Sequence, residues 1–145
     1  MQGLHRIKFK NVRKGRLRKM EFKANSLKFG VIGLKATQSG ILKTKQLHAA
    51  RQVISKIIKK SGKVWTRVFA CLPISSKPTG SRMGKGKGQL DHWSAKVSSG
   101  TILFEICSKN KEESYWALKS ASKKLPLKTK ILYHYYSTTN YNTIK

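Results

Sequence analysis

The chain has 145 residues, and its 32 lysines and arginines against five acidic residues give a formal net charge of +27. A net charge of about 2–8 is enough to keep a small domain soluble, so most of these cations are expected to face a polyanion. This balance argues against a self-contained small-molecule enzyme: we expect no catalytic residue, no cofactor and no small-molecule substrate. No run approaches the ~20 consecutive apolar residues of a membrane span.

Residues 1–28 are predicted to form a basic arm, in which ten cations accompany a single acid, Glu21. A few apolar residues are interspersed among the cations without a helical period. Such a segment is either a solvated tail or an arm that orders against phosphates and uses its sparse apolar residues to return to the core. An arginine-rich presequence would also lack acids, but the absence of a helical apolar face argues against it.

Residues 29–132 are predicted to form a single α+β domain. Apolar residues at spacings of three and four predict a helix that Thr44 caps and that ends before Gly62. The opposite face of this helix is polar and carries four cations and no acid. We therefore expect the helix to bury one side in the core and to expose a basic side.

The remaining elements follow from shorter patterns. A run rich in β-branched and aromatic residues predicts a strand over 63–71, which Pro73 ends and a long loop follows. Alternating residues on both sides of 98–100 predict a hairpin with one buried face. A second helix is expected to begin at Asn110, with Glu113 as a reciprocal cap. The predicted architecture is two helices packed on an antiparallel sheet.

Several residues are interpreted as having no chemical role. Cys71 and Cys107 are too few for a disulfide framework or a four-ligand zinc site, and we expect both to be small core residues. The scattered histidines and acids form no nucleophile–base pair and no metal-ligand cluster, so no metal is expected. Residues 133–145 are mostly polar and are expected to form a C-terminal extension that is loosely held unless a partner binds it.

A glycine-rich loop over 80–88 is the segment most suggestive of function. Four glycines alternate there with arginine and lysine, so backbone N–H groups can approach an anion while the side chains supply charge. The spacing fits neither a P-loop, because Gln89 follows Gly88, nor a dinucleotide fingerprint, because the loop leads into a strand. The segment is therefore either a hairpin loop without a role or a mobile loop that contacts a nucleic-acid backbone.

Two motifs resemble the signatures of one protein family. Residues 82–88, Arg-Met-Gly-Lys-Gly-Lys-Gly, with Trp93 beyond them, resemble the glycine-rich signature of large-subunit ribosomal protein sixteen of bacteria and organelles. Residues 59–65, Lys-Lys-Ser-Gly-Lys-Val-Trp, resemble the other family signature, although the family usually has Arg where Lys60 stands. With shorter matches in the arm and both helices, the resemblance covers about residues 6–132.

The resemblance implies a structural, non-enzymatic protein of the large ribosomal subunit, with an α+β fold of the hammerhead type, near the peptidyl-transferase region. It implies large-subunit rRNA, tRNA and neighbouring ribosomal proteins as partners. The residues expected to bind rRNA are Lys8, Lys10, Arg13, Lys14, Arg16, Arg18, Lys45, Arg51, Lys56, Lys59, Lys60, Lys63 and Arg67. The residues expected to lie close to tRNA during translation are Arg82, Met83, Gly84, Lys85, Gly86, Lys87 and Gly88.

A nucleoid-type protein that compacts DNA is the alternative function, because it would also carry a large positive charge. The compartment is predicted from composition: 25 lysines against seven arginines are typical of an AT-rich organelle genome. The chain also begins directly at the arm of the family, and residues 72–78 are similar to mitochondrial members. We therefore expect a mitochondrial ribosome, with the bacterial cytoplasm and the plastid as alternatives.

Overall fold

The computed structural model describes residues 12–17, 19–84 and 86–134, and it confirms an α+β fold. The helices and strands are, in chain order, β1 (Ile32–Ala36), β2 (Gly40–Lys43), α1 (Thr44–Ile58), β3 (Gly62–Thr66), β4 (Leu72–Ser76), β5 (Gln89–Val97), β6 (Ile102–Ser108), α2 (Lys111–Ser122) and β7 (Thr129–Tyr133). The extension predicted over 133–145 begins too early, because Tyr133 ends β7 and the N–H of His134 donates to the carbonyl of Val31 at 2.7 Å; residues 135–145 lie outside the described residues.

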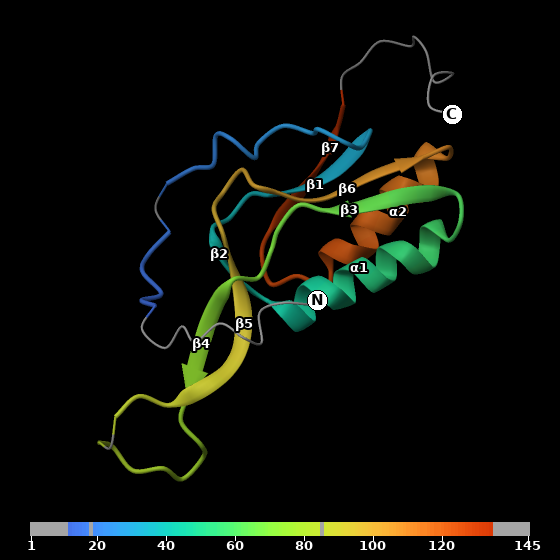
Figure 1. Ribbon diagram of the computed structural model, residues 1–145. Coiled ribbons are helices and arrows are strands. Elements are labelled where there is room, and N and C mark those ends of the chain that lie inside the picture. Colours follow the sequence, from blue (N-terminus) through green and yellow to red (C-terminus); the bar gives the residue numbers. More distant parts are fainter. Residues whose placement is uncertain (1–11, 18, 85, 135–145) are drawn as a thin grey trace.

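The strands form two antiparallel sheets where one was expected. The larger sheet has the order β3-β6-β1-β7, and the smaller one has the order β2-β5-β4. The two helices pack against each other, and α2 also contacts β1, β6 and β7 of the larger sheet (Figure 1). The core between these layers contains Leu34, Phe104 and Ile106 from the sheet and Ile54 and Leu118 from the helices, all fully buried.

The first helix forms as its apolar spacing predicts, but its cap is different. The N-cap is Lys43, whose backbone N–H donates to the side-chain oxygen of Gln46 at 2.9 Å. Thr44 is already helical, and its hydroxyl donates to the carbonyl of Trp93 at 2.7 Å. The prediction that Thr44 is the cap is therefore wrong, because this side chain ties the start of α1 to β5 instead.

The second helix begins where the sequence predicts. Asn110 is its N-cap and accepts a hydrogen bond from the N–H of Glu112 at 3.1 Å. Glu113 does not act as the expected reciprocal cap, because its carboxylate accepts from the hydroxyl of Ser61 at 3.4 Å. This contact joins the start of α2 to the turn between α1 and β3.

The predicted hairpin across residues 98–100 is wrong. β5 pairs with β2 and β4 in the smaller sheet, whereas β6 pairs with β1 and β3 in the larger one. The turn therefore carries the chain from one sheet to the other. Gly100, with φ +96°, allows it, and a Cβ there would lie 3.0 Å from the carbonyl oxygen of Glu21. The prediction of one buried face is also wrong for β6, where residues 102–106 are buried on both faces, and alternation carries no information about the neighbouring strand.

The predicted strand over 63–71 is only partly right, because β3 ends at Thr66 and residues 67–71 lie in no strand. The prediction that Pro73 ends the strand and opens a loop is wrong, because a separate strand, β4, passes through Pro73 and pairs with β5. Proline is tolerated there because β4 is an edge strand. Cys71 precedes β4 and is exposed, so its assignment to the core is wrong, whereas Cys107 is partly buried.

Candidate nucleic-acid interface

The predicted cations of α1 and the following segment form an exposed basic face. We use this name for Lys45, Arg51, Lys56, Lys59, Lys60 and Lys63, all of which are exposed. Lys45 and Lys56 lie about three helical turns apart on one side of α1. The buried residues of α1 occupy its other side, and the helix contains no acid. Lys45 and Lys56 therefore form a row of charges without carboxylate partners on α1, while Arg51 lies about 120° around the helix from Lys45 and Lys63 lies on β3 beside Trp65.

The described part of the basic arm is an extended segment without regular secondary structure. Arg13, Lys14 and Arg16 are exposed, whereas Lys8, Lys10 and Arg18 lie outside the described residues. Of the two predicted forms of the arm, one has its apolar side chains return to the core. Met20 and Phe22 do not do so, because Met20 is 63% exposed and Phe22 is 82% exposed.

Backbone hydrogen bonds attach the arm to the body instead. The N–H of Glu21 donates to the carbonyl of Ser99 at 2.9 Å, and the N–H of Ile102 donates to the carbonyl of Ala24 at 3.0 Å. The arm therefore runs beside the turn that joins β5 to β6. Among its apolar residues, Leu17 and Leu27 are half-buried.

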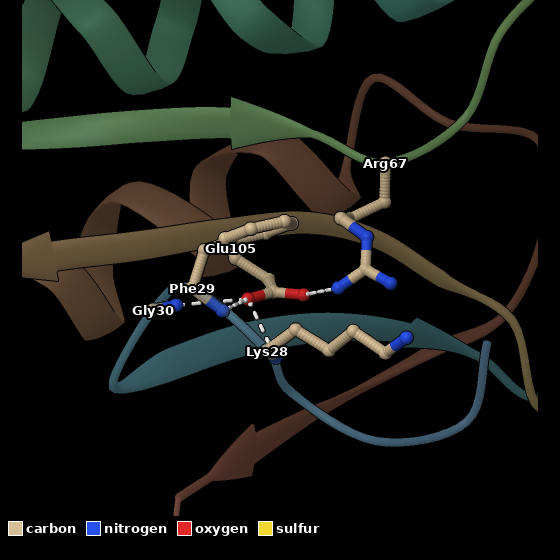
Figure 2. Close-up of polar contacts among 5 residues, drawn as sticks. All are labelled: Lys28, Phe29, Gly30, Arg67 and Glu105. Carbon is tan, nitrogen blue, oxygen red and sulfur yellow. Dashed lines mark hydrogen bonds and ion pairs between the residues drawn. The ribbon is translucent and has the colours of Figure 1, made fainter.

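A buried carboxylate, Glu105 on β6, fixes the point where the arm enters β1. Its side chain is fully buried, and one of its oxygens accepts three backbone N–H groups in succession (Figure 2). The donor distances are 3.1 Å from Lys28, 2.7 Å from Phe29 and 2.8 Å from Gly30. A side chain at residue 30 would prevent this approach, because its Cβ would lie 2.7 Å from the backbone nitrogen of Ile106.

The other oxygen of Glu105 forms an ion pair with Arg67, which follows β3. Burial alone would raise the pKa of this carboxyl group. The three backbone donors and the charge of Arg67 outweigh burial, so the pKa of Glu105 lies below its ordinary value of 4.5. The group is therefore a carboxylate at neutral pH, with hydrogen bonds to both of its oxygens.

This ion pair changes the assignment of Arg67. The residue was predicted to bind rRNA, but its side chain is only 14% exposed and pairs with Glu105 inside the protein. We therefore place Arg67 in the internal polar network and not on the basic face. Glu105 was not predicted as the partner of Arg67. The available signal was an acid within the apolar run of β6, in a chain that has only five acids.

The glycine-rich loop lies at the tip of a hairpin formed by β4 and β5, which extends away from the helices (Figure 1). Arg82 is exposed and Met83 is 97% exposed, while Lys85 lies outside the described residues. The loop bends through glycines with positive φ, including Gly84 at +92° and Gly86 at +84°. These angles are easily adopted only by glycine, which explains the composition of the loop.

The remaining residues of the loop are also at the surface. Lys87 is exposed and Gly88 is half-buried, with its backbone against that of Ser76 where the two strands meet. Lys77 donates from Nζ to the carbonyl of Gly84 at 2.6 Å, which connects the two sides of the loop. The structure thus brings the predicted loop residues to one tip, apart from the basic face on α1 and β3.

Together, the fold and this surface define a basic α+β protein with an exposed row of cations and a separate basic loop. Within the described ranges there is no cluster of side chains able to hold a metal ion. In the same part of the chain, no helix is both long and apolar enough to cross a membrane. This is the class of a protein that packs against a nucleic acid.

The chain belongs to the ribosomal protein L16p/L10e family, whose sequence model matches residues 4–132. It is 43% identical over 128 residues to large ribosomal subunit protein uL16 of Dichelobacter nodosus, covering 88% of this chain and 93% of that protein. It is 41% identical over 127 residues to the uL16 protein of Bartonella henselae, with 88% and 93% covered. It is 42% identical over 127 residues to large ribosomal subunit protein uL16c of Emiliania huxleyi, with 88% and 92% covered.

Proposed function

We propose that this chain is a structural protein of the large ribosomal subunit, that it binds rRNA through the basic arm and the basic face, and that it holds the glycine-rich loop close to tRNA. The family match over residues 4–132 and the names of the relatives support the ribosomal role. The observation that carries the rRNA contact is the basic face, whose six cations are exposed.

The electrostatics of the chain favour phosphates as the partners of these cations. Glu105 pairs with Arg67 in the interior, and Asp91 lies 2.8 Å from the ring of its neighbour His92. The side chain of Glu21 accepts the N–H of Lys23 at 3.0 Å within the arm itself. Of the other two acids, Glu113 accepts from Ser61 beside the end of α1, so at most this carboxylate offsets the charge of the basic face, which stays strongly positive toward an external polyanion.

A binding comparison tests the rRNA contact against the DNA alternative. We expect the full chain to bind a folded large-subunit rRNA fragment more tightly than duplex DNA of equal length at the same salt concentration. With 6–10 phosphate contacts, affinity should fall about 10³–10⁵-fold between 50 and 200 mM salt. Equal affinity for both nucleic acids, measured by filter binding across this range, would favour the DNA-compacting function instead.

The proposed position of the loop predicts a separation of two functions. Replacing Arg82, Lys85 and Lys87 by alanine should leave rRNA affinity within about threefold, because the basic face is untouched. The same change should slow tRNA accommodation by roughly tenfold or more, since the loss of even one hydrogen bond from a charged group, about 1.5–3 kcal/mol, corresponds to at least that factor. The measurements are rRNA binding and the rate of tRNA accommodation on reconstituted ribosomes.

A matched variant controls for net charge in that experiment. Replacing the exposed lysines Lys123, Lys128 and Lys130 by alanine removes the same charge far along the chain from the loop. This variant should accommodate tRNA at the normal rate. Failure of the loop variant to enter the subunit would show that the loop is an assembly contact and would contradict the tRNA role.

The compartment stays a prediction. The relatives include bacterial uL16 proteins and the uL16c protein of Emiliania huxleyi, which supports a bacterial or organellar ribosome. Within this range, the excess of 25 lysines over seven arginines is the feature that favours a mitochondrial ribosome.

A further inference from the structure

An aromatic side chain, Phe29, is displayed at the surface beside the buried Glu105. Its ring is stacked on Trp65, with ring centroids 6.1 Å apart and an interplanar angle of 22°. The Arg67 guanidinium carbon lies 5.2 Å from the centroid of the Phe29 ring, and Lys63 Nζ lies 5.4 Å from the centroid of the Trp65 ring. Phe29 nevertheless remains 57% exposed. We call these two rings the aromatic platform.

The backbone holds the platform in place. The N–H of Phe29 donates to Glu105 at 2.7 Å, and the N–H groups on both sides of it donate to the same oxygen. Trp65 lies in β3, opposite Glu105 in the register with β6. The exposed Phe29 ring is thus held by stacking on Trp65, and its main chain is held by the hydrogen bond to Glu105 on β6.

The charge around the platform is positive. Lys63 is exposed with its Nζ over the Trp65 ring, and Lys28, next to Phe29 in the chain, is exposed too, whereas the charge of Arg67 is balanced by Glu105. The nearest acid, Glu105, is fully buried and fully hydrogen-bonded, so it offers no negative charge at the surface. A fixed, exposed aromatic face surrounded by cations is the arrangement that stacks an unpaired nucleobase while the cations approach its phosphates.

We propose that Phe29, supported by Trp65, stacks on one unpaired base of the large-subunit rRNA, and that Lys63 lies near the phosphates of that nucleotide. This inference rests on the proposed rRNA binding and deepens it. It adds a base contact, made by Phe29 and supported by Trp65, to the phosphate contacts of the basic face. A search for charged residues alone would not select these two residues.

The test replaces Phe29 by leucine, which keeps an apolar side chain and removes the aromatic ring. Affinity for a folded large-subunit rRNA fragment should fall about 5- to 100-fold. The slope of log affinity against log salt concentration should not change, because no charge is removed. Phe29→Tyr keeps the ring and should retain affinity within about twofold. Chemical probing should show one unpaired base that the wild type protects and the leucine variant leaves reactive.

Phe69 provides the matched control, since it lies outside the arm, the basic face and the glycine-rich loop, is 65% exposed and makes no ring stack within the described ranges. Phe69→Leu should bind within about twofold of the wild type. If the wild type binds rRNA and Phe29→Leu binds equally well, the stacking inference is overturned while rRNA binding stands. If the wild type does not bind, the proposed function itself fails. Normal rRNA affinity with loss of a neighbouring ribosomal protein from the particle would assign the platform to a protein contact instead.

Discussion

Glu105→Gln is expected to lower the free energy of unfolding by about 3 kcal/mol, the lower end of the range for breaking a buried ion pair. The amide cannot balance the charge of Arg67, and its single carbonyl oxygen is a weaker acceptor for three successive N–H groups than a carboxylate. Glutamine keeps the size of the side chain, so the loss is not due to a cavity. Urea unfolding followed by circular dichroism measures it.

The control is Glu113→Gln, the same substitution at an exposed position on α2. Its carboxylate accepts one long hydrogen bond from Ser61, at 3.4 Å, so the change should be within about 0.5 kcal/mol. Equal effects of the two substitutions would show that the buried network does not stabilise the fold.

Wild type and Glu105→Gln should also differ in how their unfolding free energy depends on pH. The pKa of Glu105 is lowered in the folded state, so its ionisation stabilises the fold fully above the ordinary value of 4.5. This stabilisation is lost as pH falls below 4.5 through the lowered pKa. The difference in unfolding free energy between wild type and Glu105→Gln should therefore be constant from about pH 7 to 5 and shrink below that. A difference that grows on acidification would contradict the assignment.

Neutralising the basic face should have the second large effect. Replacing Lys45, Arg51 and Lys56 by glutamine removes three exposed cations from α1 without touching its buried residues. If each contacts a phosphate, the slope of log affinity against log salt should decrease in magnitude by about 2–3. Affinity for the rRNA fragment at 100 mM salt should fall about 100-fold. Fluorescence anisotropy across a salt series measures both quantities.

The variant with Lys123, Lys128 and Lys130 replaced by glutamine has the same net charge and serves as the control. Because these lysines lie outside the basic face, we expect its salt slope to change by less than one. If both triple variants lose affinity equally, binding responds to total charge alone and the basic face is not a specific contact.

The helices were predictable because their information is local. Leu47, Ala50, Ile54 and Ile58 repeat at helical spacing, and all four are buried in α1. The sheets were predicted less well because strand partners are not encoded in a single strand. β5 and β6 alternate on both sides of a short turn, yet they pair in different sheets. Pro73 also concealed β4, since its tolerance at a sheet edge depends on where the strand lies.

In the candidate interface, too, local sequence patterns predicted the exposed residues but not the contacts between distant parts of the chain. The exposure of Lys45 and Lys56 followed from the helical period, and the position of the loop tip followed from its glycines. Arg67 was assigned wrongly because its partner, Glu105, is 38 residues away in sequence and meets it only through the pairing of β3 with β6. Phe29 was not selected because a single aromatic residue before a glycine gives no signal until Trp65 is placed beside it.

The attachment of residues 21–30 to the body has a thermodynamic consequence for assembly. Fixing the backbone of one residue costs about 1–2 kcal/mol of conformational entropy. The hydrogen bonds of residues 21–30 to Ser99, Ile102 and Glu105 offset this cost when the protein folds. Association with RNA then does not have to order residues 21–30, so more of its favourable free energy remains as affinity.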